Sequence, residues 1–196
     1  LQELSFIFSV NHPKSISLSK HFYSMKNFKI RQETKEDLDE VYQLIKTAFE
    51  TAKVKDGDEQ DFAVKLREGK NFIPELSMVA ETDGKLIGHI MMTQTPVLQS
   101  NGERYTALLV APLSVQLEYR DLGVGSALMK EGLRLAAEMG YQAVFLTGDP
   151  NYYSRFGYQS SSRFGITCPG IPDQYVLAYE LVPHALDKVE GTIGEW

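Results

Sequence analysis

Two dipeptides that favour tight turns, Asp83-Gly84 and Asn101-Gly102, divide the middle of the chain. Both kinds of pair tolerate positive φ angles, which the common two-residue hairpin turns require. The segments beside them, 76–82, 86–98 and 105–115, are rich in apolar and β-branched residues, as strands are. The sequence therefore predicts three antiparallel strands joined as a meander, and the other segments must pack against this sheet.

Helical patterns lie on both sides of the meander. Residues 34–37, TKED, form a capping-box pattern and begin a helix, which follows a short strand at 28–31. A second helix is predicted over 58–67, and the best one covers 123–139 and stops at Gly140. The residues at helical spacing are Leu38, Val41, Leu44, Ile45, Ala48 and Phe49 in the first helix, and Val124, Leu128, Leu135, Ala136 and Met139 in the last.

The final third of the chain is predicted to return to the sheet. Residues 143–146 are continuously apolar, as in a strand that is buried on both faces. Asp149-Pro150 ends that strand, and Pro150 suits the first turn of a short helix that Gly157 closes. The clearest late strand covers 175–182. This order of elements predicts an α/β (α+β layered) domain, with a mostly antiparallel sheet and helices on both faces.

Net charge, the lengths of the apolar runs and the cysteine count exclude some classes of function. A formal net charge of -6 argues against nucleic-acid binding, and no apolar run approaches the length of a membrane helix. Cys168 is the single cysteine, so no internal disulfide can form and a cytoplasmic location is expected. A single domain is expected over 25–196. Residues 1–24 are interpreted as an upstream or added extension, or else as an arm that packs on a neighbouring subunit of a homodimer.

The junction between the third meander strand and the best helix suits an anion. A helix N-terminus presents unpaired N–H groups and the positive end of its dipole. Glycines at 123 and 125 leave those amides open, which suits a diphosphate held by the backbone, and Arg120 could add a charge. The alternative is a simple strand-to-helix turn without a ligand.

Two other phosphate loops fit this junction less well. A P-loop needs Gly-Lys-Ser/Thr at the helix start, whereas this chain has Gly125-Ser126-Ala127. A dinucleotide fingerprint needs a third glycine where Leu128 stands, and it belongs to a parallel βαβ unit rather than to an antiparallel meander. A nucleotide-binding α/β protein remains the third hypothesis.

Two segments together resemble the GNAT superfamily of N-acetyltransferases. Residues 113–115, LSV, and 119–128, YRDLGVGSAL, are similar to motif A, with its Gln/Arg-x-x-Gly-x-Gly/Ala signature. Residues 148–158, GDPNYYSRFGY, are similar to the downstream motif, in which a tyrosine precedes a glycine by four residues. The second segment is typical of a bacterial branch, the YhbS-like predicted acetyltransferases. Leu117 departs from the family, which often has proline there.

This resemblance implies a fold with a splayed central strand pair and acetyl-CoA as co-substrate, without a metal. Backbone groups near Leu113 and Val115 would pair with the pantetheine arm, and a primary amine would attack the thioester directly. The tyrosine that matches Tyr153 would protonate the departing thiolate. The cofactor-binding set that the resemblance implies is Leu113, Val115, Arg120, Asp121, Leu122, Gly123, Val124, Gly125, Ser126 and Asn151.

Several assignments stay open at the level of sequence. Tyr153 could simply pack in the core, and Asn151 could cap the short helix rather than contact the cofactor. The general base is not identifiable, with Glu59, Glu81, Glu103 and the strand residue His89 as the candidates. The acceptor could be a small-molecule or a peptide amine. An acyl-CoA-binding regulatory domain without turnover is the second hypothesis.

Overall fold

The computed structural model describes residues 28–51 and 57–194, so the predicted extension 1–24 lies outside the described residues. The strands are β1 (Lys29–Gln32), β2 (Phe72–Thr82), β3 (Lys85–Leu98), β4 (Arg104–Val115), β5 (Ala143–Thr147), β6 (Gln159–Ser160), β7 (Ile166–Thr167), β8 (Val176–Glu180) and β9 (Gly191–Ile193). The α-helices are α1 (Leu38–Phe49), α2 (Glu59–Glu68), α3 (Val124–Glu138) and α4 (Pro150–Tyr153), and short 3-10 turns include η1 (Lys35–Asp37), η2 (Leu117–Tyr119) and η3 (Ser154–Phe156).

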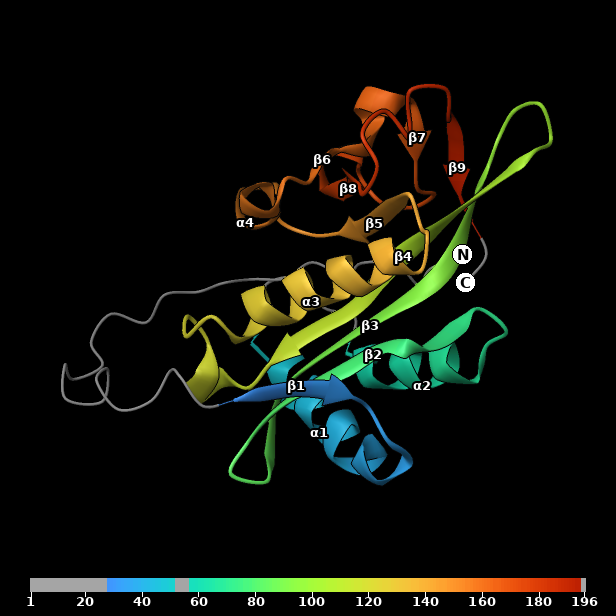
Figure 1. The fold of residues 1–196 in the computed structure, drawn as a ribbon. Helices are drawn as coiled ribbons and strands as arrows, with labels where there is room; N and C mark the ends of the chain where they lie inside the picture. The colour runs from blue at the N-terminus through green and yellow to red at the C-terminus, as the bar shows by residue number, and fades with distance from the viewer. Residues whose placement is uncertain (1–27, 52–56, 195–196) are drawn as a thin grey trace.

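The strands form one sheet in the order β1-β2-β3-β4-β5-β8-β6, and β9 joins the long strand β3 (Figure 1). Pairing is antiparallel from β1 to β4, whereas β4 and β5 are parallel. The predicted meander and the mixed α/β class are confirmed. Strand β2 begins at Phe72 rather than at residue 76, and the short strands β6, β7 and β9 were not predicted.

The turns of the meander have the predicted geometry. Asp83 and Gly84 have φ angles of 50° and 74°, and Gly102 has a φ of 86°. The capping box before α1 is also formed, because the Asp37 carboxylate accepts the N–H of Thr34 at 2.7 Å. The neighbouring guanidinium of Arg31 holds the pKa of Asp37 well below its usual range. Local chemistry therefore fixes both hairpin turns and the start of α1.

Helices cover the two faces of the sheet (Figure 1). Helices α1 and α2 bury one set of strand side chains, and α3 buries the other set. Met139, predicted to share the buried face of α3, is 44 % exposed, because the helix ends at Glu138 and Met139 is only its C-cap. Met129 and Gly132 lie on the buried face instead. No helix in residues 28–51 and 57–194 combines the length and apolar character needed to cross a membrane.

A β-bulge interrupts the pairing of β3 with β4. Ile90 pairs with Leu113 and Met92 with Val110, so Ala111 and Pro112 together oppose Met91. One extra residue reverses the alternation of side chains beyond it. Leu113 therefore packs with the α3 layer, and the next residue, Ser114, points to the α1–α2 face. In a strand without the bulge, Leu113 would face the α1–α2 layer and Ser114 would face α3.

The C-terminal strand β9 should depend on a glycine at its first residue. Gly191 has a φ of 147°, and a Cβ built there would lie 2.1 Å from the carbonyl oxygen of Leu98. Because that neighbour is backbone, it cannot turn aside. We expect Gly191→Ala to lower the free energy of unfolding by about 3 kcal/mol, measured by urea denaturation. Gly102→Ala is the control, since it has a positive φ but open space and should cost about 1 kcal/mol. If both variants lost the same free energy of unfolding, close packing at Gly191 would not be the reason for its glycine.

Candidate functional site

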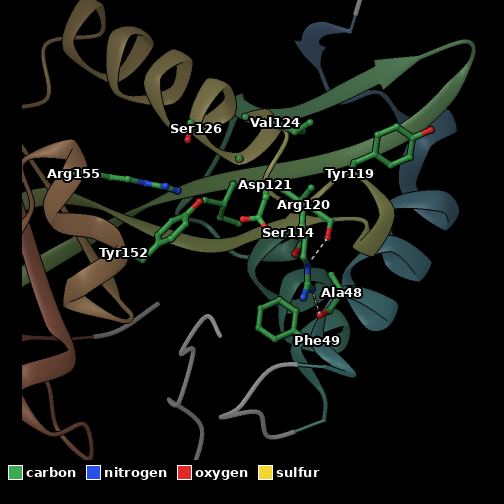
Figure 2. Close-up of a pocket in the computed structure, with 14 residues that line it drawn as sticks. Ala48, Phe49, Ser114, Tyr119, Arg120, Asp121, Val124, Ser126, Tyr152 and Arg155 are labelled. Carbon is green, nitrogen blue, oxygen red and sulfur yellow. Dashed lines mark hydrogen bonds between the residues drawn. The ribbon is translucent and has the colours of Figure 1, made fainter. Parts of the chain in front are cut away.

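The candidate site is a cavity where β4 and β5 separate. Their parallel pairing, within the described residues, consists of Leu108 with Val144 and Leu109 with Phe145. Pro112, farther along β4, has no N–H to donate to a neighbouring strand. Beyond the paired residues β4 continues to Val115, where the cavity is lined by the end of β4, the start of α3, the end of α1 and the α4–η3 segment (Figure 2).

The start of α3 presents backbone amides to this cavity. Gly123 is the N-cap residue, with a φ of 86°, and Val124, Gly125 and Ser126 follow it along the wall. The first-turn amides of a helix have no partner within the helix. A Cβ on Gly125 would lie 3.3 Å from both the Tyr152 hydroxyl and a Val115 methyl. The bare glycine therefore keeps this end of the cavity open, as a site for a diphosphate requires.

Arg120 does not supply the charge that the sequence suggested. Its Nη2 donates to the carbonyl of Ala48 at 2.6 Å and its Nη1 to the hydroxyl of Thr51 at 2.9 Å. Both acceptors lie at the C-terminal end of α1, where the helix dipole favours a cation. Figure 2 shows the guanidinium turned toward α1 and away from the start of α3. Arg120 touches the cavity, but it mainly ties the loop before α3 to α1.

Among the described residues, Arg155 is a second cation that lines the cavity, and sequence reasoning missed it. It extends from the η3 turn toward the start of α3 (Figure 2). Its guanidinium carbon lies 3.8 Å from the centre of the Tyr152 ring, and it forms no salt bridge with a described residue. The available signal was the spacing Tyr-x-x-Arg in residues 152–155, which places both side chains on one side of a helical turn.

The two adjacent tyrosines of α4 lie in different surroundings. Tyr152 lines the cavity, whereas the side chain of Tyr153 is 1 % exposed and packs with the α3 layer. Residues next to each other on a helix point about 100° apart, which accounts for the different surroundings of the two rings. The Tyr153 ring instead packs against Gly148, where a Cβ would meet it at 2.4 Å. Tyr153 is therefore not among the described residues that line the cavity, and its role as the general acid stays a prediction. Burial raises the pKa of its phenol well above the ordinary range.

The other predicted site residues divide into two groups. The residues that line the cavity are Leu113, Val115, Arg120, Asp121, Gly123, Val124, Gly125 and Ser126, together with Ser114, which was not predicted. Leu122 and Asn151 do not line it. Asn151 donates its N–H and its side-chain amide to the Asp149 carboxylate, so it belongs to the cap of α4, the alternative that the sequence left open.

The candidate bases also lie in distinct places. Glu59, Glu81 and Glu103 do not line the cavity, and Glu81 forms an ion pair with Arg31. His89 is fully buried in β3, directly opposite Ser114 of β4. Its Nε2 lies 2.9 Å from a carboxylate oxygen of Glu33. The histidine is therefore a direct cross-strand neighbour of a cavity residue.

Comparison with known proteins agrees with this architecture. The sequence pattern of the Acetyltransferase (GNAT) domain matches residues 29–160. YjhQ of Escherichia coli K12, described as an uncharacterized N-acetyltransferase, is 37% identical over 103 residues, which are 52% of this chain and 55% of YjhQ. YhbS of the same strain, with the same description, is 35% identical over 121 residues, 60% of this chain and 70% of YhbS. The chain thus spans little more than half of YjhQ.

Two solved structures show the same fold over most of the chain. The E. coli YhbS structure in complex with CoA has a TM-score of 0.75 and 31% identity, covering 85% of this chain and 88% of YhbS. A GNAT family acetyltransferase from Brucella melitensis in complex with acetyl-CoA has a TM-score of 0.71 and 26% identity, covering 87% and 96%. With its splayed strands, its open helix start and these relatives, the chain belongs to the GNAT family of N-acetyltransferases.

Proposed function

We propose that this chain transfers the acetyl group of acetyl-CoA to a primary amine by direct attack of the amine on the thioester. The observation that carries the proposal is the cavity at the end of β4, which opens onto the first-turn amides of α3. The YhbS structure contains CoA and the Brucella structure contains acetyl-CoA, which supports the same co-substrate here. The acceptor is a small-molecule or peptide amine, and the cytoplasmic location stays a prediction, as does the single domain over 25–196.

In the proposed complex the diphosphate of CoA lies on the amides of Val124, Gly125 and Ser126. The pantetheine arm then runs along the edge of β4 at Leu113 and Val115, toward the point where β5 separates. Arg155 supplies the positive charge near the diphosphate, since it faces the start of α3 and has no carboxylate partner among the described residues. Tyr152 contributes its hydroxyl at the same end, because that hydroxyl lies beside Gly125.

Tyr153 remains the proposed general acid for the thiolate. Its ring packs against Gly148, just beyond the C-terminal end of β5, and therefore near the far end of the proposed pantetheine path. The high pKa keeps the phenol protonated, as an acid requires. Its burial is also the observation that favours the second hypothesis, binding of acyl-CoA without turnover. Consumption of acetyl-CoA with a panel of alkyl, aminoglycoside and peptide amines separates the two.

Gly125→Val should weaken CoA binding while the protein stays folded. The new side chain would fill the space between the Tyr152 hydroxyl and Val115, where the diphosphate must approach the amides. We expect the Kd for CoA, measured by calorimetry, to rise by about tenfold or more. Ala127→Val, two residues along α3 and outside the cavity lining, is the control. An unchanged affinity in Gly125→Val would rule out this location for the diphosphate.

Arg155→Ala should weaken CoA binding through loss of charge. A cation beside a diphosphate contributes mainly by electrostatic attraction, which salt screens. The Kd for CoA is expected to rise about tenfold at low salt, and the difference from wild type should shrink as salt is added. The exposed Arg163→Ala variant should bind like wild type. A loss that is independent of salt would mean that Arg155 acts by packing on Tyr152.

The two tyrosines should differ in which kinetic constant they control. Tyr152→Phe removes a hydroxyl beside the diphosphate end, so KM for acetyl-CoA should rise while kcat changes little. Tyr153→Phe should lower kcat by about 10²-fold without changing the Kd for CoA. Because burial raises the pKa of Tyr153, its acid form persists at all pH values from 6 to 9, and its contribution should not fall with rising pH in that range. If Tyr152→Phe lowered kcat and Tyr153→Phe changed only KM, Tyr152 would be the general acid instead.

A further inference from the structure

A buried chain of charged groups ends next to the cavity. Arg67 of α2 donates to both carboxylate oxygens of Glu33, from Nε at 2.7 Å and from Nη2 at 3.0 Å. Glu33 Oε2 also lies 2.9 Å from Nε2 of His89, which is fully buried, and the Ser77 hydroxyl lies 3.4 Å from the same nitrogen. Arg67 and Glu33 are the charged groups that face the imidazole from the elements packed against it.

The partners of Glu33 determine which nitrogen of His89 carries a proton. Bonds from His89 and Arg67 lower the pKa of Glu33 to about 2, so its carboxylate is ionised and can only accept. Nε2 of His89 must therefore be the donor. Burial lowers the pKa of the imidazole below its ordinary value, so the ring is neutral at pH 7. In a neutral ring with a proton on Nε2, Nδ1 holds a free lone pair.

His89 is paired across the sheet with the strand that lines the cavity. His89 and Ser114 are direct partners across β3 and β4, which places their side chains on the same face of the sheet. Ser114 lines the cavity although it is 1 % exposed. Among the described residues, neither His89 Nδ1 nor Ser114 Oγ has a hydrogen-bond partner, so the two atoms are not bonded to each other in this structure. Two buried polar atoms on adjacent residues are thus left open beside the cavity, which is unusual unless they have a function.

We propose that Ser114 and His89 form the path by which the acceptor amine loses its proton. The inference rests on the proposed acetyl transfer and supplies its missing base. In the reacting complex the Ser114 hydroxyl turns to hydrogen-bond distance from His89 Nδ1. The acceptor ammonium then gives its proton to Ser114 Oγ, and the hydroxyl proton of Ser114 passes to His89 Nδ1. The resulting imidazolium is stabilised by the Glu33 carboxylate. The free amine then attacks the thioester carbon, the C–S bond breaks, and His89 releases the proton to solvent before the next turnover.

The β-bulge makes this path possible. Without the extra residue at Ala111-Pro112, Ser114 would point to the α3 face, and His89 would have an apolar residue opposite it. Arg67 and Glu33 then act as positioning residues: they hold the imidazole in one tautomer and compensate its positive charge when it is protonated. The same device, a buried carboxylate that orients a histidine, serves general bases in other enzymes.

The kinetic test compares two short alkyl amines that differ strongly in how firmly they hold a proton, each measured against its own wild-type rate. Ethylamine is protonated at neutral pH, whereas 2,2,2-trifluoroethylamine is not. Ser114→Ala should reduce kcat/KM for ethylamine by about 10²-fold and for trifluoroethylamine by less than about threefold. Thr93→Val is the matched control, since Thr93 also has a buried, unpartnered hydroxyl but does not line the cavity. Equal losses with both amines, or an acetylated Ser114 seen by mass spectrometry, would overturn the relay.

A second measurement does not depend on turnover. Nitrogen NMR of the full chain labelled with ¹⁵N-histidine, assigned with His89→Gln, should show a neutral His89 ring at pH 7 with its proton on Nε2. A proton on Nδ1, or an imidazolium at pH 7, would refute the proposal.

The pH dependence of turnover gives a third test. Because a base works when unprotonated, kcat/KM should fall only as pH drops below 6.5. If wild type consumes no acetyl-CoA with any amine, the proposed transferase function is wrong. The NMR spectrum still tests the predicted protonation of His89, because it does not require turnover.

Discussion

The separation of β4 from β5 is the constraint on which the rest of this structure depends. Two parallel strands that stay paired would close the sheet and leave no space at the end of β4. Here the described pairing of β4 with β5 ends at Leu109 and Phe145, and Pro112, farther along β4, has no N–H with which to extend it. Helices cover both faces of the sheet beside this point, and the cavity at the end of β4 reaches the start of α3.

Positive charge around the opening is divided between two arginines with different tasks. Arg120 is held by acceptors at the C-terminal end of α1, so it fixes the loop that leads into α3. Arg155 leans on the Tyr152 ring and leaves its guanidinium facing the cavity. An arginine that already donates to backbone carbonyls has few donors left for a ligand. The cavity therefore takes its cation from the α4–η3 segment, and its backbone amides from α3.

The buried Arg67–Glu33–His89 chain gives little reason to expect extra stability. Removing charged groups from water costs free energy that ion pairing returns only in part, so buried ion pairs are often no more stabilising than apolar packing. Such a chain is easier to understand if it orients a functional group. Here it leads from α2 through the β1–α1 connection to β3, and it stops one strand away from the cavity. Its position connects the α1–α2 layer to the chemistry proposed at β4.

The sequence by itself determined the parts of this protein that depend on neighbouring residues. Asp83-Gly84 and Asn101-Gly102 predicted the meander, Pro150 and Gly157 bounded the α4–η3 segment, and the glycines before α3 predicted an open helix start. Tertiary structure alone decided what each long side chain touches. The Arg120 guanidinium bonds to α1, the Tyr153 ring packs with the α3 layer, and the His89 imidazole contacts Glu33, because these contacts join segments far apart in the chain. The spacing of residues within one segment does not predict contacts with a distant segment. The β-bulge in β4 is one example, because it determines that Ser114 pairs with His89.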